Sequence, residues 1–315
     1  MAVYTQVSAE ALAGFLARYD VGELVSAKGI AEGVENSNYL VDTTGQNGRG
    51  ARFILTLYEK RVAAGDLPFF MALLEHLAAK GLPVPPAIPD RDGRAIQELA
   101  GRPACLIRFL TGVSLSQPTA AQAFAAGSAL GEMHRAVADF APTRANSMGK
   151  DSWRPLFERC GASLDQIAPG LHAALGRALD RVEAAWPANL DACAIHADLF
   201  PDNVLMLGDT VTGLIDFYFA CTDLRVYDLA VMHTAWAFDA SGATHDAAVG
   251  EALVAGYERH FPLSEGERVA FPILAQGACV RFALSRAWDW LNTPADALVT
   301  RKDPLAYVRR LEHYS

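Results

Sequence analysis

The sequence lacks the features that would assign it to secreted, membrane or nucleic-acid-binding proteins. Its five cysteines are widely spaced and form no C-x-x-C pair, which argues against a disulfide framework or a zinc site and indicates a reducing cytoplasm. The first residues have no signal-peptide pattern, and no apolar run is long enough to span a bilayer. The formal net charge of -9 disfavours nucleic acid and anionic membranes as partners, since both select basic surfaces.

What the sequence contains divides it into two parts. Its 315 residues, 51% hydrophobic and 20% charged, suit a globular protein with two lobes. The first part is predicted to contain a hairpin of strands 39–41 and 53–58 around a turn at 45–48, further strands at 95–99 and 103–109, and helices at 8–19 and 67–80. The second part is mostly helical, with helices predicted at 119–138, 153–167, 171–186, 245–260 and 265–292. The pattern predicts an α+β fold with two domains, residues 1–110 and 111–315.

The segment from Ile195 to Phe217 carries the most chemical information. Residues 204–207 form an apolar strand, Gly208 and Asp209 are turn residues, and residues 211–215 form a return strand. Antiparallel pairing would bring Asn203 and Asp216 side by side at about 5 Å. Asp198 would lie on the loop that leads into this hairpin.

These three side chains suggest phosphoryl transfer. The oxygens of Asn203 and Asp216 suit a Mg²⁺ ion that is shared with substrate phosphates. Asp198 is placed to accept a proton from an attacking hydroxyl. A kinase site has the same parts: a catalytic Asp, a metal-binding Asn five residues later, and a second metal-binding Asp. The alternative is an ordinary turn, because Asp and Asn favour turns in any case.

His196, within this segment, and Asp228, after it, each have two interpretations. His196 stands two residues before Asp198, which suggests acid–base work, but the corresponding position in kinases braces the backbone. We expect the bracing role. Asp228 is predicted to be a buried brace for the same loop, and a helix N-cap is its alternative role.

Several strings of the sequence resemble the aminoglycoside-phosphotransferase/choline-kinase family. The two main strings run from His196 to Leu205 and from Leu214 to Cys221. Others occur in family order at residues 35–39, 53–59, 66–70, 101–104, 289–292 and 302–304, and together they cover nearly the whole chain. Within the family the sequence is most similar to the bacterial homoserine kinases. No G-x-x-x-x-G-K-[ST] motif occurs, which argues against a P-loop kinase.

The resemblance implies a protein-kinase-like fold, with a small N-terminal β-lobe for the nucleotide and a larger helical lobe for catalysis and substrate. It implies ATP and Mg²⁺ as cofactors and phosphate transfer to the side-chain hydroxyl of L-homoserine, as in threonine biosynthesis. By the same resemblance the candidate nucleotide-binding residues are Gly33, Asn36, Ser37, Asn38 and Thr56. Acceptors such as an amino alcohol or an aminoglycoside, and a non-catalytic kinase fold that only binds ligands, remain alternatives.

One departure from typical kinases concerns the phosphate clamp. Such kinases pair a Lys on the third strand with a Glu on the following helix, whereas this sequence has Thr56 and the Phe69–Phe70 region at those places. Because both partners are missing, neither charge is left unpaired. Lys60 or Arg61 can replace the clamp, and a role as solvated surface charges is the alternative.

The substrate residues have a weaker sequence signal. A homoserine site needs groups that bind a carboxylate and an ammonium. Arg281 is the preferred carboxylate ligand because its guanidinium can donate two parallel hydrogen bonds, and Tyr218 and Asp289 are further candidates. The sequence contains no signal for the oligomeric state.

Overall fold

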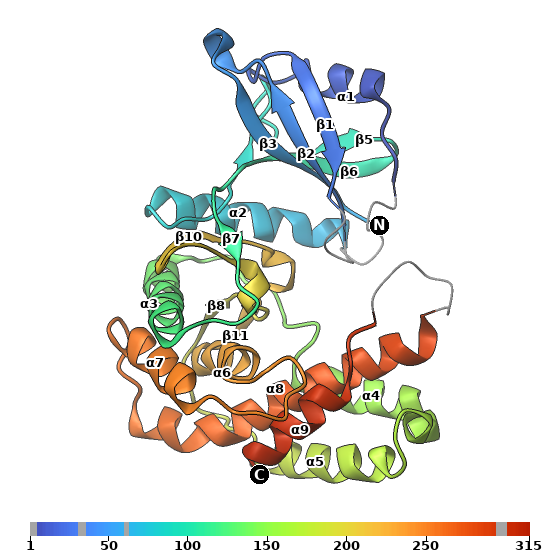
Figure 1. Ribbon diagram of the computed structural model, residues 1–315, viewed down its shortest axis with the longest axis vertical. Coiled ribbons are helices and arrows are strands. Elements are labelled where there is room, and N and C mark those ends of the chain that lie inside the picture. The colour runs from blue at the N-terminus through green and yellow to red at the C-terminus, as the bar shows by residue number, and fades with distance from the viewer. Residues whose placement is uncertain (1–4, 31–35, 60–62, 294–300) are drawn as a thin grey trace. The chain divides into compact units, whose positions relative to one another are not determined.

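The computed structural model describes residues 5–30, 36–59, 63–293 and 301–315. The chain divides into two compact units, Met1–Thr111 and Gly112–Ser315 (Figure 1). The first is built around a sheet and the second is largely helical, which confirms the predicted mixed class. Within the described residues, no helix is long and apolar enough to cross a membrane. All five cysteines are free thiols.

The N-terminal unit is an antiparallel sheet with two helices. Its strands are β1 (Leu24–Gly29), β2 (Ser37–Thr43), β3 (Ala51–Leu57), β4 (Ala87–Ile88), β5 (Gln97–Leu99) and β6 (Arg102–Arg108). They follow the order β1-β2-β3-β6-β4, and β5 also pairs with β6. The predicted hairpin is β2 and β3, although both strands are longer than the sequence pattern indicated. The helices are α1 (Ala9–Leu16) and α2 (Leu67–Ala79).

Alternating burial and helix capping explain why these elements form. Residues of β2 are alternately buried and partly exposed along the strand, as expected of a strand with one face on a core. The side chain of Ser8 accepts a hydrogen bond from the backbone of Ala11 and caps α1, as predicted. Apolar side chains of α1 then pack on the sheet in one core, which includes Leu12, Phe15, Val41 and Leu55.

The C-terminal unit contains helices α3 (Ala120–Ala136), α4 (Lys150–Cys160), α5 (Leu171–Ala185), α6 (Arg225–Trp236), α7 (Ala247–Glu258), α8 (Glu265–Asn292) and α9 (Leu305–His313). The long helix α8 lies at its centre and contacts α4, α5, α6 and α9 (Figure 1). The structure reproduces the predicted bounds of α8, and capping boxes begin both α3 and α8. The helix predicted at 153–167 is wrong at both ends: α4 begins at Lys150 and stops at Cys160, where Gly161 takes a φ of 51°.

Helices α3 and α7 pack closely because glycines line their contact. A Cβ atom added to Gly127 would collide with the backbone carbonyl of Leu253, and one added to Gly256 would collide with that of Phe124. Only hydrogen in place of a side chain allows the two backbones to come so near. Small residues such as Gly127 in α3 and Gly256 in α7 therefore have a packing role.

Two small sheets complete the C-terminal unit. The first has strands β7 (Val113–Ser114), β9 (Val204–Leu207) and β10 (Thr210–Leu214), in the order β10-β9-β7, and the second pairs β8 (Ala192–Ile195) with β11 (Cys221–Leu224). The hairpin predicted around Gly208 and Asp209 is thus confirmed as β9 and β10. The sequence analysis did not identify β1, β4, β7, β8, β11, α6 and α9.

Candidate active site

Two connecting segments of the C-terminal unit, residues 196–203 and 215–220, lie side by side. The first joins β8 to β9, and the second joins β10 to β11. Strand β8 pairs with β11, and β9 pairs with β10, both antiparallel. The first connection therefore begins where the second ends, and it ends where the second begins. The first carries Asp198 and Asn203, and the second carries Asp216. The paired strands therefore bring the three predicted residues to one end of the hairpin.

Asn203 links the two segments. The backbone N–H of Ile215 donates to the carbonyl of Asn203 at 3.0 Å. The predicted pairing of Asn203 with Asp216 is therefore wrong by one residue, and Asp216 is the next residue beyond this pair. Asp216 has a φ of 65°, and this left-handed conformation turns the chain out of β10. The Asn203 Nδ2 donates to the carbonyl of Asp198 at 2.8 Å, and no donor in the described part of the chain reaches its Oδ1. The amide oxygen of Asn203 is thus available to a cation.

The Asp198 carboxyl group has an unusual electrostatic environment. It is only partly exposed, and burial raises its pKa to about 8 from the ordinary 3.8, because protein around a carboxyl disfavours the charged form. The negative charge of Asp216 raises this pKa further, and the positive charges of Arg281 and Lys302 lower it. The effect of Asp216 on this pKa indicates that the carboxyls of Asp198 and Asp216 lie within electrostatic reach of each other.

Asp228 supports the loop from the first turn of α6. Its carboxylate accepts hydrogen bonds from the backbone N–H groups of His196 and Ala197, each at 2.7 Å. The ring of His134 also contacts it, with Nε2 at 3.1 Å. Burial acts to raise the pKa of Asp228, but these hydrogen bonds and the neighbouring imidazoles hold it below its ordinary value. Leu224, not Asp228, is the N-cap of α6.

The imidazole of His196 joins the loop to the hairpin. Its Nδ1 accepts from the backbone N–H of Asp198 at 3.2 Å, and its Nε2 lies 2.9 Å from the carbonyl of Ile215. The proton must therefore be on Nε2, which donates to that carbonyl. Burial lowers the pKa of His196, so the ring is neutral near pH 7. Both ring nitrogens are engaged with backbone, which leaves neither for acid–base chemistry.

Ala197 has a strained backbone that Arg281 helps to hold. Its φ of 63° is unfavourable for a residue with a Cβ, at a cost of about 1–2 kcal/mol. Asp228 holds its N–H, and Nη1 of Arg281 donates to its carbonyl. Arg281 is 2% exposed and lies over the rings of Phe219 and Phe282. Arg281 is thus held against the loop that carries Asp198, and its role as a carboxylate ligand stays a prediction.

The nucleotide-binding candidates belong to the N-terminal unit. Gly33 lies outside the described residues, as do Lys60 and Arg61. The Ser37 hydroxyl donates to Glu59 at 2.7 Å, and the Thr56 hydroxyl donates to Asn38 at 2.8 Å. Ser37 and Thr56 are buried, so these contacts give them roles inside the sheet. Asn36 differs, because its buried Nδ2 has no acceptor within the described residues.

The remaining candidates are spread along the C-terminal unit. Tyr218 is in the turn Phe217–Phe219 directly after Asp216. Asp289 is in the last turn of α8, eight positions after Arg281. Two cations that the sequence analysis did not select, Arg286 and Lys302, interact electrostatically with Asp198. Neither cation has a local sequence signal for this interaction, because both lie far from Asp198 along the chain.

The donor atoms present fit a magnesium ion that is held together with phosphates. Within the described residues, no group of three or more His, Cys, Asp or Glu side chains could hold a metal ion. A Mg²⁺ ion that accompanies a nucleotide needs only one or two protein carboxylates, since phosphates and water complete its shell. The carboxylate of Asp216 and the Oδ1 of Asn203 are ligands of this kind.

Comparison with known proteins assigns this geometry to a family. Residues 26–267 match the phosphotransferase enzyme family. The chain is 51% identical over 314 residues to the homoserine kinase of Granulibacter bethesdensis, covering 100% of this chain and 97% of that protein. It is 54% identical over 311 residues to the homoserine kinase of Nitrobacter winogradskyi, covering 99% of this chain and 94% of that protein.

Solved structures show the same fold at low sequence identity. A spectinomycin phosphotransferase in complex with ADP and spectinomycin has a TM-score of 0.71 at 14% identity, covering 99% of this chain and 96% of that one. An amicoumacin kinase in complex with AMP-PNP and Ca²⁺ has a TM-score of 0.71 at 13% identity, covering 97% and 92%. These likenesses show the predicted protein-kinase-like fold, since both neighbours are phosphotransferases of that fold.

Proposed function

This chain belongs to the phosphotransferase enzyme family, and on that premise we propose that it is a homoserine kinase. The enzyme transfers the γ-phosphate of ATP to the side-chain hydroxyl of L-homoserine and yields O-phospho-L-homoserine. The observation that carries the assignment is identity of 51% and 54% to curated homoserine kinases over 100% and 99% of this chain. A relationship of that extent supports the acceptor, whereas the fold alone supports only phosphoryl transfer.

Asp198 is the proposed catalytic residue. Its carboxylate accepts a hydrogen bond from the acceptor hydroxyl and orients the oxygen for in-line attack on the γ-phosphorus. It takes the proton as the new O–P bond forms and the bond between the γ-phosphorus and the β–γ bridging oxygen breaks, with ADP as the leaving group. The carboxyl must be ionised to do so, and the charges of Arg281 and Lys302 act in that direction by lowering its pKa. The hydrogen bonds that Asp228 and Arg281 make to Ala197 fix the peptide next to Asp198. A fixed peptide positions the carboxylate without reorganisation during the reaction.

Asn203 and Asp216 are the proposed metal ligands. Both residues lie at the open end of the β9–β10 hairpin, away from its turn. The Oδ1 of Asn203 is turned away from the hydrogen bond that its Nδ2 makes to Asp198. A Mg²⁺ ion held by these two side chains would offset the negative charge that develops on the phosphate oxygens. We propose that the N-terminal unit binds the nucleotide, with Asn36 and Asn38 as its described polar candidates.

The proposed function is tested by acceptor profiling. Purified protein is assayed for ADP release with Mg²⁺-ATP and L-homoserine, ethanolamine, choline or kanamycin as acceptor. We expect L-homoserine to give a far higher kcat/KM than the other three, and the product to be O-phospho-L-homoserine by mass spectrometry. A higher kcat/KM with ethanolamine, choline or kanamycin would reassign the acceptor. Nucleotide binding without turnover on any of them would indicate a non-catalytic kinase fold.

A further inference from the structure

Two cationic side chains of the C-terminal unit act on Asp198 without forming an ion pair. Arg286 lies on α8 and Lys302 lies shortly before α9. The charge of Lys302 acts to lower the pKa of Asp198, and the charge of Asp198 reaches Arg286. Neither cation contacts a carboxylate oxygen in the described part of the chain. A cation without a carboxylate partner near the proposed catalytic residue can receive an anionic group of the substrate.

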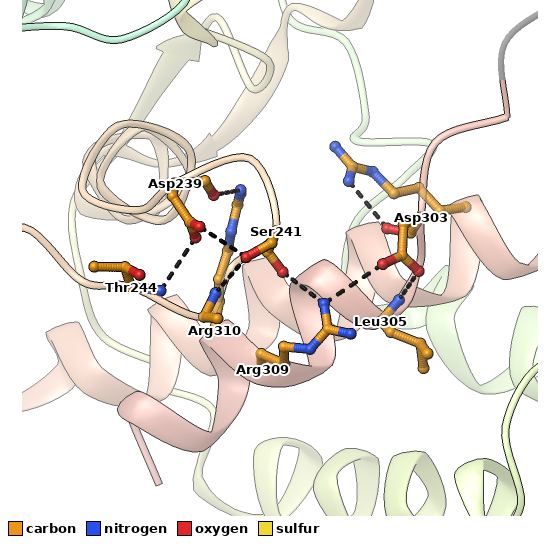
Figure 2. Close-up of polar contacts among 9 residues, drawn as sticks. Asp239, Ser241, Thr244, Asp303, Leu305, Arg309 and Arg310 are labelled. Atoms are coloured by element: carbon orange, nitrogen blue, oxygen red, sulfur yellow. Dashed lines mark hydrogen bonds and ion pairs between the residues drawn. The ribbon is translucent and has the colours of Figure 1, made fainter.

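The guanidinium of Arg286 is held in place but has donors to spare. Its central carbon lies 4.6 Å from the ring centroid of Tyr307, and one terminal nitrogen donates to the backbone carbonyl of Asp303 at 3.2 Å. The carboxylate of Asp303 is engaged elsewhere: it accepts from the N–H of Leu305 at 2.9 Å and contacts Arg309 at 3.5 Å (Figure 2). The other N–H groups of Arg286 have no acceptor among the described residues.

Aromatic rings connect both cations to the catalytic loop. Lys302 places its ammonium 5.7 Å from the ring of Phe200, which follows Asp198 by two residues. The ring of Phe282 lies 5.0 Å from that of Phe200 and 4.9 Å from that of Tyr307. Arg286 and Lys302 therefore both contact one group of aromatic rings, whose faces attract cations.

We propose that Arg286, assisted by Lys302, binds the carboxylate of the acceptor amino acid while its hydroxyl lies at Asp198. The inference rests on the proposed function and names the residues that select its substrate. In L-homoserine three carbon atoms separate the hydroxyl oxygen from the carboxylate, a span of roughly 5 Å. Ring contacts from Tyr307 through Phe282 to Phe200 connect Arg286 to the loop that carries Asp198. The planar pair of donors of its guanidinium matches the two carboxylate oxygens.

Arg281 does not compete for this role. It is 2% exposed, and its terminal nitrogen already donates to Ala197. Arg286 is more exposed, and its one hydrogen bond leaves most of its donors available. Burial lowers the pKa of Arg286, but a guanidinium remains charged at any pH that the enzyme encounters. The site thus presents a permanent positive charge to the substrate.

The test compares two acceptors that differ only in the carboxylate. 3-Aminopropan-1-ol has the hydroxyl and the amine of homoserine at the same spacing but no carboxylate. For Arg286→Met we expect kcat/KM for L-homoserine to fall by about 10²-fold, because a desolvated charge pair is lost. For 3-aminopropan-1-ol we expect a change of less than about 3-fold, since the missing group has no partner there. The KM for ATP should remain unchanged.

Three variants sharpen the result. Arg159→Met is the matched control, because it removes another ring-stacked guanidinium, 4.0 Å from Trp288 of α8, and should affect neither acceptor. Lys302→Met should lower kcat/KM for homoserine by about 10-fold or less, since Lys302 is exposed and screened. Arg286→Lys keeps the charge without the planar fork and should lie between wild type and Arg286→Met.

Equal losses on both acceptors, or no loss on either, would overturn the proposal. So would a rise in the KM for ATP, which would assign Arg286 to the phosphates. If Arg286→Met does not fold, Arg286→Lys and Lys302→Met decide the question with the same pair of acceptors. If the wild-type enzyme does not phosphorylate L-homoserine at all, the proposed function itself is wrong. That result is distinct from a failure of the proposal for Arg286, which requires an active wild type.

Discussion

Replacing Asp198 with Asn should make the protein less active and more stable. The substitution keeps the size of the side chain but removes its charge. As the proposed proton acceptor, Asp198 contributes on the order of 10²–10⁴ to the rate. We therefore expect kcat to fall by that factor, while the KM for ATP changes little because Asn203 and Asp216 are the proposed metal ligands.

The gain in stability follows from the pKa of Asp198. The folded protein holds this carboxyl group with a pKa of about 8, against 3.8 for an ordinary Asp. Between these values the folded state binds a proton that the unfolded state has released, so stability falls as pH rises through the window. Below the lower value the group has no effect, and above about pH 8 the full cost is present. Since the carboxylate is partly exposed, we discount this cost to about 1–3 kcal/mol.

Thermal unfolding at two pH values measures the effect. At pH 8.5 Asp198→Asn should raise the Tm by several degrees, because about 1 kcal/mol shifts the Tm of a domain of this size by roughly 2–4 °C. At pH 5 the gain should be smaller, since the wild-type carboxyl is protonated in the folded state there. The control is Asp202→Asn, which removes an exposed charge on the same loop and should leave both Tm and kcat close to wild type.

Two outcomes would refute this reasoning. If Asp198→Asn is no more stable than wild type at pH 8.5, then Asp198 is not buried at a cost. If the variant loses nucleotide binding as severely as turnover, then Asp198 is a metal ligand or a structural residue. If Asp198→Asn has the kcat of the wild type, then Asp198 is not the proton acceptor. Asp202, the other carboxylate of the loop, would not explain the activity, since it is exposed.

Two further substitutions test the metal site and the loop support. Asp216→Asn should abolish most turnover and weaken Mg²⁺-dependent binding of ATP in calorimetry, and near-normal activity would contradict the role of the β9–β10 hairpin. Asp228→Asn should lower the free energy of unfolding by about 3–5 kcal/mol in urea titrations, because a fully buried acceptor of two backbone N–H groups is lost. A loss under about 1 kcal/mol would show that the loop is held mainly from elsewhere.

Local sequence signals were sufficient for the hairpin that carries the site. Strand β9 is an apolar run, Gly208 takes a positive φ in the turn, and β10 returns directly, so every contact is between near neighbours in sequence. The register was predicted one residue off, because the structure pairs Asn203 with Ile215 and not with Asp216. The helices predicted at 8–19 and 119–138 likewise begin at the N-caps Ser8 and Thr119, because an N-cap is a local interaction.

The elements that were not predicted lack such signals. All twelve residues of α6 are buried, so the helix has no polar face and no amphipathic period to detect. Strand β1 has the opposite problem, since most of its residues are exposed and it shows no alternation. Its place in the sheet comes from pairing with β2. Tertiary contacts determine both elements, and a sequence pattern reports such contacts only indirectly.

The arginines of α8 show the same limit at the level of function. Arg281 and Arg286 are five residues apart, so their side chains point about 140° away from each other around the helix. Sequence alone could not tell which of these faces meets the catalytic loop and which meets Tyr307. The structure separates them: Arg281 is inserted beneath Ala197, while Arg286 shares a face with Phe282 and stacks on Tyr307. A guanidinium that is already bound to a strained backbone carbonyl supports the loop, and one with free donors beside the same loop is suited to receive the substrate.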